Sequence, residues 1–137
     1  MSLFVDTSIW YAPADSSDRS NALAKAILKS DEALVTSDHV LVETWTLLRH
    51  RLRPRAAERF WDGLRSGIGS IEPVGLADLE AAWNIGRSWP DQDFSIVDRT
   101  SFAVMLRLGI DRVASLDEHF AVFRFGPKRR HSFNLVR

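Results

Sequence analysis

Acidic side chains occur at four points of the chain where the neighbouring residues are apolar. Two of them, Asp6 and Asp117, each follow a short apolar run that resembles a buried strand. The other two, Glu43 and Asp98, lie in segments with the apolar spacing of an amphipathic helix. Ionised carboxylates are rarely buried without a partner, because removing the charge from water is costly. The four acids therefore raise the question of what balances their charge.

Each acid alone also has a purely structural interpretation. Asp6 suits a helix N-cap, and Asp117 suits a turn after a strand. Glu43, at the boundary of an apolar stripe, can reach solvent or pair with an arginine. Asp98 stands at capping-box spacing after a serine, where the helix dipole also favours an acid. Its position on the same helical face as Phe102 weakens that explanation, because it directs the carboxylate inward.

The four acids are more informative as a set. If four carboxylates converge at ~6 Å, each pair repels by ~3 kcal/mol at an effective dielectric of ~20, or ~17 kcal/mol in all. This exceeds the stability of a typical domain, roughly 5–15 kcal/mol. Such a cluster needs retained protons, basic neighbours or a cation, and Mg²⁺ or Mn²⁺ suits oxygen ligands best. A site of this kind suits phosphodiester hydrolysis. Candidate supporting residues are Ser8, Ser115 and Asp93.

Short apolar runs alternate with helical patterns along the chain. The apolar spacing predicts helices over residues 20–30, 37–50, 54–64, 76–89 and 95–108. It predicts strands over residues 3–5, 33–35, 70–74, 112–116 and 133–136. This alternation predicts one α/β domain over residues 1–137, a three-layer α/β/α sandwich with a central, mostly parallel sheet. In such sheets the ligand site lies off the carboxyl ends of the strands, so Asp6 and Asp117 are expected at one edge.

The bulk composition limits the remaining classes of protein. The chain has 137 residues, 45% of them hydrophobic and 26% charged, which is typical of a folded domain. It has no cysteine, which excludes disulfides and thiolate metal sites. Its four histidines lie in separate segments, which argues against a zinc site. No apolar run has the length of a membrane span and the first residues lack a secretory pattern, so we expect a cytoplasmic protein.

Four short motifs resemble those of PIN-domain ribonucleases, and in particular the VapC-type toxins of toxin–antitoxin pairs. They are F-V-D-T-S at Asp6, V-E-T-W at Glu43, D-x-D-F-S-I-V-D-R-T-S-F at Asp98 and S-L-D-E-H-F at Asp117. Each motif is short, but together they follow the family's order and cover nearly the whole chain. Ser115 is a mild departure, because the family more often has threonine there, and the hydroxyl is retained.

The resemblance implies a PIN fold and cleavage of RNA by water that depends on Mg²⁺ or Mn²⁺. It carries over the metal-binding and catalytic roles to Asp6, Glu43, Asp98 and Asp117. It also implies a homodimer and inhibition by a cognate small antitoxin, whose C-terminal segment enters the acidic groove. The identity of the RNA is not implied.

Basic residues form two clusters, although the formal net charge is zero. Clustered cations are typical of surfaces that bind nucleic-acid phosphates. The structural alternatives are a helix C-terminus, where the dipole favours cations, and a charged turn before an edge strand. Both clusters are therefore candidates for RNA binding. Their members are Arg49, Arg51 and Arg53, and Lys128, Arg129 and Arg130.

Two other functions use acids in similar places. A phosphoaspartate protein, such as a receiver domain or a phosphatase, needs a lysine late in the chain at a strand end. The three lysines, Lys25, Lys29 and Lys128, do not fit that position, and the phosphatase D-x-D is missing after the first strand. The second alternative is a protein-binding module without catalytic activity, in which the acids hold an arginine of a partner.

Overall fold

Five parallel strands form the centre of the protein, for which a computed structural model describes residues 1–137. Their spatial order is β3-β2-β1-β4-β5, and every neighbouring pair is parallel. The predicted α/β sandwich is therefore confirmed, with a sheet that is wholly rather than mostly parallel. The strands are β1 (Ser2–Val5), β2 (Ala33–Ser37), β3 (Ser70–Glu72), β4 (Arg112–Ala114) and β5 (Asn134–Val136).

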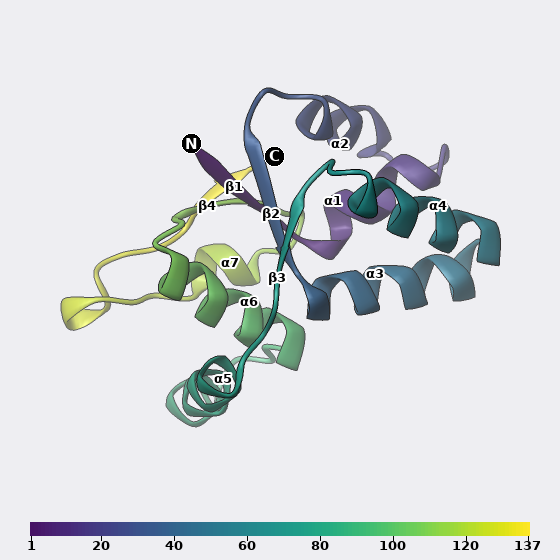
Figure 1. Ribbon diagram of the computed structural model, residues 1–137. Helices are drawn as coiled ribbons and strands as arrows, with labels where there is room; N and C mark the ends of the chain where they lie inside the picture. Colours follow the sequence, from purple (N-terminus) through teal and green to yellow (C-terminus); the bar gives the residue numbers. More distant parts are fainter.

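Seven helices cover the two faces of this sheet. Helices α1 to α4 lie on one side, and α5 to α7 lie on the other (Figure 1). No helix combines the length and the apolar character that crossing a membrane requires. The helices are α1 (Thr7–Tyr11), α2 (Asn21–Leu28), α3 (Asp38–Arg51), α4 (Pro54–Arg65), α5 (Leu76–Ser88), α6 (Ile96–Leu108) and α7 (His119–Val122).

The ends of the longer helices follow from local sequence. The side chain of Ser37 accepts a hydrogen bond from the backbone of Val40 and caps α3. Pro54 stands in the first turn of α4, where its missing N–H is not needed. Gly109 ends α6 in the left-handed conformation at φ 69°, which a residue without Cβ adopts without strain.

Helices α1 and α7 were not predicted, and two strands end earlier than expected. Each of these helices is about one turn long, with 5 and 4 residues, which is too short for a helical period to show in the sequence. The strands predicted over 70–74 and 112–116 end at Glu72 and Ala114. After Ala114 the chain leaves the sheet because Ser115 and Leu116 hydrogen-bond to Asp6 and Ser8 instead.

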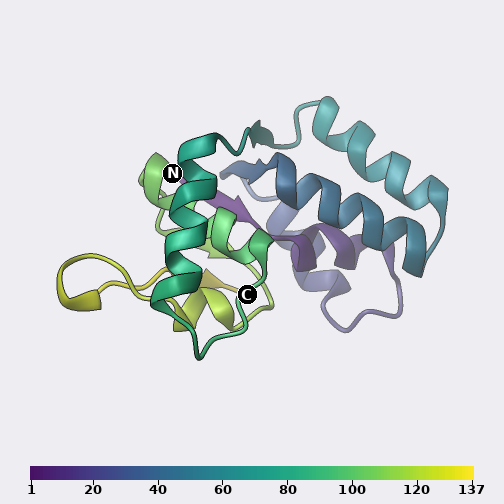
Figure 2. The ribbon, with the colours of Figure 1, turned by 90° about the horizontal axis from the view of Figure 1, so that it is seen from below.

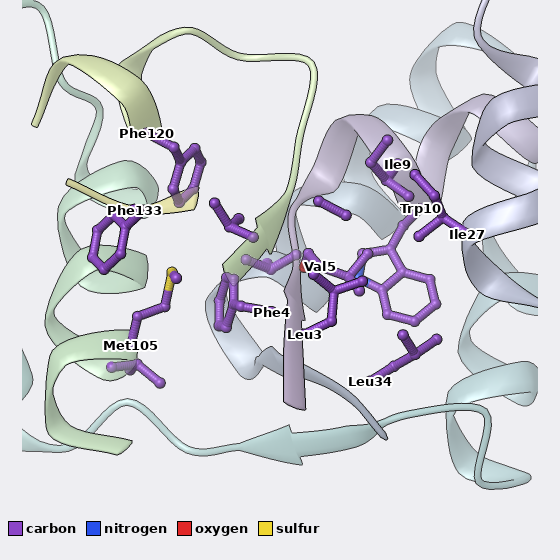
Figure 3. Close-up of a cluster of buried hydrophobic side chains, with 14 of the residues drawn as sticks. Leu3, Phe4, Val5, Ile9, Trp10, Ile27, Leu34, Met105, Phe120 and Phe133 are labelled. Atoms are coloured by element: carbon purple, nitrogen blue, oxygen red, sulfur yellow. The ribbon is translucent and has the colours of Figure 1, made fainter. Parts of the chain in front are cut away.

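Strand β1 lies at the centre of the sheet and of the hydrophobic core. Leu3, Phe4 and Val5 are almost completely buried. Figure 3 shows Phe4 directed toward Met105 and Phe120, while Leu3 and Val5 lie on the side of Trp10. A strand buried on both faces is the most rigid support that this sheet provides. The residue that follows β1 is Asp6.

Candidate functional site

A cavity of about 410 Å³ lies beyond the carboxyl ends of β1 and β4. All four predicted acids line it, so the structure brings together residues that are up to 111 positions apart (117 − 6). Of the predicted supporting residues, Ser8 and Asp93 also line the cavity, and Ser115 reaches it through Asp6. Its walls further contain Thr7, Tyr11, Asp18, Arg51 and His119, of which only Arg51 was a candidate from the sequence.

Asp6 is held in this site by the end of the neighbouring strand β4 and by the residue after it. Its backbone N–H donates to the carbonyl of Ala114 at 3.0 Å, which extends the β1–β4 pairing by one residue. The hydroxyl of Ser115 donates to Oδ2 of Asp6 at 2.8 Å and accepts from the backbone N–H of Asp117 at 2.9 Å. One serine therefore fixes the two acids at the strand ends. Asp6 occupies the predicted N-cap position of α1, but its side chain makes no cap hydrogen bond there.

Glu43 reaches the same cavity from the middle of α3. The hydroxyl of Thr7 donates to its Oε1 at 2.6 Å, and Oε2 has no hydrogen-bond partner in the protein. The sequence indicated Glu43 but not Thr7, because a residue at the start of a one-turn helix has no recognisable pattern. This contact links α1 to α3 and sets the direction of the carboxylate.

Asp98 serves both the helix and the cavity. Its Oδ2 accepts from the backbone N–H of Ser95 at 3.0 Å, and Ser95 in turn caps the backbone N–H of Asp98, so the capping box is complete. The same Oδ2 lies 2.8 Å from Nδ1 of His119. Oδ1 makes no hydrogen bond with the protein. The two interpretations of Asp98 are therefore compatible, because one oxygen caps the helix and the other stays free.

His119 is a site residue that sequence reasoning missed. Its ligand atom, together with one oxygen each of Asp98 and Asp117, forms a group whose members all lie within 4.8 Å of one another. Asp6 and Glu43 line the same cavity outside this tight group. The histidine was set aside because it has no partner histidine at metal-binding spacing. Its only local signal is that it follows Asp117 by two residues, where its backbone N–H donates to Oδ1 of Asp117 at 2.9 Å.

The charges in the cavity are not balanced by lysine or arginine. None of the four acids forms an ion pair with either residue type; His119 is the only basic partner. Burial raises the pKa of Asp6 to about 7, and the carboxylates of Asp98 and Glu43 add to the rise, against hydrogen bonds that lower it. A raised pKa is the expected result of burying a carboxylate beside other carboxylates.

His119 shifts in the complementary direction. Burial lowers its pKa, but the hydrogen bond to Asp98 and the charges of Asp117, Asp98 and Asp93 outweigh this effect and raise the pKa overall. The cavity thus offers carboxylate oxygens, with His119 hydrogen-bonded to one of them. Oxygen donors of this kind fit Mg²⁺ or Mn²⁺.

The two basic clusters are placed differently from one another. In the first, Arg51 lines the acidic cavity and lies over the ring of Tyr11, with 5.7 Å from Cζ to the ring centroid. Arg49 instead lies over Trp45, at 5.6 Å, and does not line the cavity. Arg53 faces a different, apolar groove.

The second cluster forms the tip of a hairpin. The hairpin is closed by backbone hydrogen bonds between Phe125 and His131 and projects from the body (Figure 2). Arg129 lies over Trp89 at 4.5 Å, and no residue from Lys128 to Arg130 forms an ion pair. Lys128 and Arg129 both have positive φ, 56° and 51°, a conformation that costs side-chain-bearing residues energy.

The apolar groove next to Arg53 is larger than the acidic cavity, at about 650 Å³. Trp10, Phe60 and Leu64 form part of its floor, and it contains no carboxylate. Four cations lie around it, which are Lys25, Lys29, Arg53 and Arg59. This groove has the chemistry of a binding surface and lacks the groups that hydrolysis requires.

Comparison with known proteins gives one consistent result. The family model described as PIN domain matches residues 3–126. The chain is 40% identical over 125 residues to the 23S rRNA-specific endonuclease VapC20 of Mycobacterium tuberculosis, a match that covers 90% of this chain and 95% of VapC20. It is 27% identical over 124 residues to Ribonuclease VapC26 of the same organism. The crystal structure of VapC20, described as a sarcin-ricin loop cleaving toxin, superposes with a TM-score of 0.82 at 36% identity, over 88% of this chain and 93% of that one.

Proposed function

This chain belongs to the PIN-domain family, and from that premise we propose that it is a divalent-metal-dependent endoribonuclease, the toxin of a toxin–antitoxin pair. Its substrate is RNA, with 23S ribosomal RNA as the first candidate because that is the named substrate of VapC20. The protein acts in the cytoplasm, where that RNA occurs.

In this proposal Asp6, Glu43, Asp98 and Asp117 hold Mg²⁺ or Mn²⁺, directly or through water. The cation, when bound, supplies activation of the attacking water and stabilisation of negative charge on the phosphate. Ser115 orients Asp6, and Ser8 orients the loop after β4 by accepting from the backbone N–H of Leu116 at 2.9 Å. Asp93, at the rim, assists from outside the ligand set.

One observation carries this proposal. In Glu43, Asp98 and Asp117, the protein's hydrogen bonds all go to a single oxygen of the carboxylate, and the second oxygen has no protein partner. These free oxygens are not buried in the core: their residues line the cavity, where a ligand or water can reach them. Three carboxylates that each keep one oxygen free, around one cavity, are arranged for a ligand that is not part of the chain.

The RNA contacts of the proposal follow from the two basic clusters. Arg51, at the wall of the cavity, is placed to hold a phosphate next to the cleaved one. Lys128 and Arg130, unpaired on the projecting hairpin, contact phosphates further along the strand. Arg129 packs on Trp89 and supports the hairpin. Arg49 and Arg53 are weaker candidates, because they face Trp45 and the apolar groove.

The partners of the proposal are a cognate antitoxin and a second copy of the chain. The excess of carboxylates suits a basic side chain of the antitoxin's C-terminal segment, which enters the acidic cavity and displaces the cation. For the homodimer, α5 offers an exposed apolar face, where Leu76 is 86% and Trp83 57% exposed. Analytical ultracentrifugation that compares the oligomeric state of the wild type with that of Trp83→Lys tests this face. The wild type is expected to be a dimer and Trp83→Lys a monomer.

A cleavage assay on total RNA containing 23S rRNA, with Mn²⁺ or with EDTA, tests the proposed function. The wild type is expected to cleave RNA with Mn²⁺ and not with EDTA. Asp6→Asn and Asp98→Asn are expected to lose this cleavage. Cleavage that survives both substitutions contradicts the mechanism. Trapping of an acyl phosphate on Asp6 supports the phosphoaspartate alternative, and a stable protein complex without any cleavage supports the binding module.

A further inference from the structure

The contacts of His119 single out Oδ2 of Asp98. That oxygen accepts a hydrogen bond from the backbone N–H of Ser95 and lies 2.8 Å from Nδ1 of His119, whereas Oδ1 accepts no hydrogen bond from the protein. Because a carboxylate can only accept, Nδ1 carries the hydrogen in this contact. Two donors on one oxygen fix the rotation of the carboxylate about its Cβ–Cγ bond. The oxygen left over is then the only one that Asp98 offers to the cavity.

The imidazole ring of His119 packs against the ring of Phe94. Its ring meets the edge of Phe94 with the centroids 5.2 Å apart and the planes at 82°. Phe94 is buried and contacts Trp89, Phe102 and Phe123. The histidine ring therefore packs against the aromatic part of the core. Its backbone N–H is separately bound to Asp117. A side chain held at its ring edge and its backbone is suited to holding a third group in place.

We propose that His119 is a positioning residue, which binds Oδ2 of Asp98 through Nδ1–H and thereby directs Oδ1 toward the cation. This inference rests on the proposed function, because it assumes that Asp98 is a metal ligand. The alternative role is that His119 is a ligand itself. Nδ1 is already occupied by the bond to Asp98, so a ligand role would have to use Nε2. Partners that orient a metal ligand typically change metal affinity or activity by 10–100-fold.

Two amide substitutions separate these roles, because they place a donor at different ring positions. His119→Asn keeps an N–H near the place of Nδ1 and has no group at Nε2, whereas His119→Gln places its amide near Nε2. The readout is Mn²⁺ affinity of the full chain by calorimetry without RNA, supported by kcat and KM for cleavage. His119→Ala serves as the full deletion and His50→Asn, at an exposed position, as the matched control.

Positioning predicts that His119→Ala and His119→Gln bind Mn²⁺ roughly 10–100-fold more weakly, with reduced kcat and unchanged KM. His119→Asn and His50→Asn are expected to bind as the wild type does. Wild-type affinity in His119→Ala overturns the inference, and equal losses in the Ala and Asn variants assign His119 as a ligand instead. Asp98→Asn is measured in parallel: if it also binds Mn²⁺ normally, the proposed function fails rather than this inference alone. Circular dichroism identifies any variant that has lost its fold.

Discussion

Two buried acids, Asp78 and Asp98, occupy the same position at the start of a helix and have opposite surroundings. Each is the third residue of its helix, α5 or α6, and each accepts a hydrogen bond at 3.0 Å from the backbone N–H three positions earlier. Their exposed fractions are 4% and 8%. By helix propensity and burial they are equivalent positions.

The difference lies in what compensates the charge. The guanidinium of Arg107 binds both oxygens of Asp78, at 2.9 and 3.0 Å. These hydrogen bonds hold the pKa of Asp78 below its usual value in spite of burial. Asp98 forms no ion pair with an arginine. His119 contacts one of its carboxylate oxygens, and the other oxygen makes no hydrogen bond with the protein. The same helical position therefore occurs with two different surroundings: an arginine bound to both carboxylate oxygens, or one carboxylate oxygen without a protein hydrogen bond.

The largest expected effect separates the two acids by activity. Asp98→Asn is expected to lower RNA cleavage by about 1,000-fold, because roughly 4 kcal/mol of charge stabilisation at the transition state depends on the cation site. Asp78→Asn, with the same change at the same helical position, is expected to cleave as the wild type does. Single-turnover cleavage of 23S rRNA with Mn²⁺ measures both. Equal losses in the two variants would remove the distinction.

Asp78 and the cavity acid Asp6 are predicted to respond to pH in opposite directions in the absence of metal. The pKa of Asp6 is raised to about 7 in the folded protein, so its protonation stabilises the fold below the unfolded pKa and this contribution is lost as pH rises toward 7. The loss is about 3 kcal/mol between about pH 5 and pH 8. The raised pKa of His119 acts in the same direction.

Asp78 contributes with the opposite sign, because its lowered pKa gives stability that is present above its unfolded pKa and lost as pH falls. Urea unfolding in EDTA across this pH range measures the slopes. Asp6→Asn is expected to flatten the loss at rising pH, while Asp78→Asn leaves that loss in place. A wild-type curve without a decline toward pH 8 contradicts the assigned charge state of Asp6.

A third comparison uses the cation as a stabilising ligand. At about 100 times its Kd, Mn²⁺ is expected to raise the free energy of unfolding by about 2.7 kcal/mol, because it binds only the folded chain. The wild type and Asp78→Asn are expected to gain this amount, and Asp98→Asn is not. Urea unfolding with and without Mn²⁺ measures the gain, with NaCl at the same ionic strength as a control for general charge screening.

The smallest effect concerns the partner of Asp78. Arg107→Met leaves a buried carboxylate without a cation and is expected to lower the free energy of unfolding by about 2 kcal/mol, less than a fully buried pair would lose because Arg107 is 40% exposed. Cleavage per folded molecule is expected to stay unchanged. The double variant Arg107→Met with Asp78→Asn should recover part of the stability. A fall in cleavage would show that this ion pair also shapes the site.

Most of the fold and half of the site were predictable from sequence, for identifiable reasons. The long helices have periodic apolar residues and most of the strands are short apolar runs. An acid follows β1 directly and another follows β4 by three residues, and the parallel topology brings both to one edge. The family resemblance was likewise confirmed by comparison. The roles of the individual acids stay predictions.

The contacts between distant segments were not predictable. His119 meets Asp98 across 21 positions, and Arg107 meets Asp78 across 29, and neither spacing has a recognisable pattern. Thr7 binds Glu43 across 36 positions. A sequence shows which residues can carry charge or donate a hydrogen bond, but the partner of each is decided by packing.

The order of the strands has a consequence for protein synthesis. The central strand β1 is made first, yet its neighbour β4 is made near the end, and the bond from Ser115 to Asp6 joins residues 109 positions apart. A nascent chain on the ribosome therefore has no acidic cavity until residue 117 has emerged and β4 has paired with β1. Such distant pairing also forms slowly. The complete acidic cavity therefore forms only after most of the chain has been synthesised.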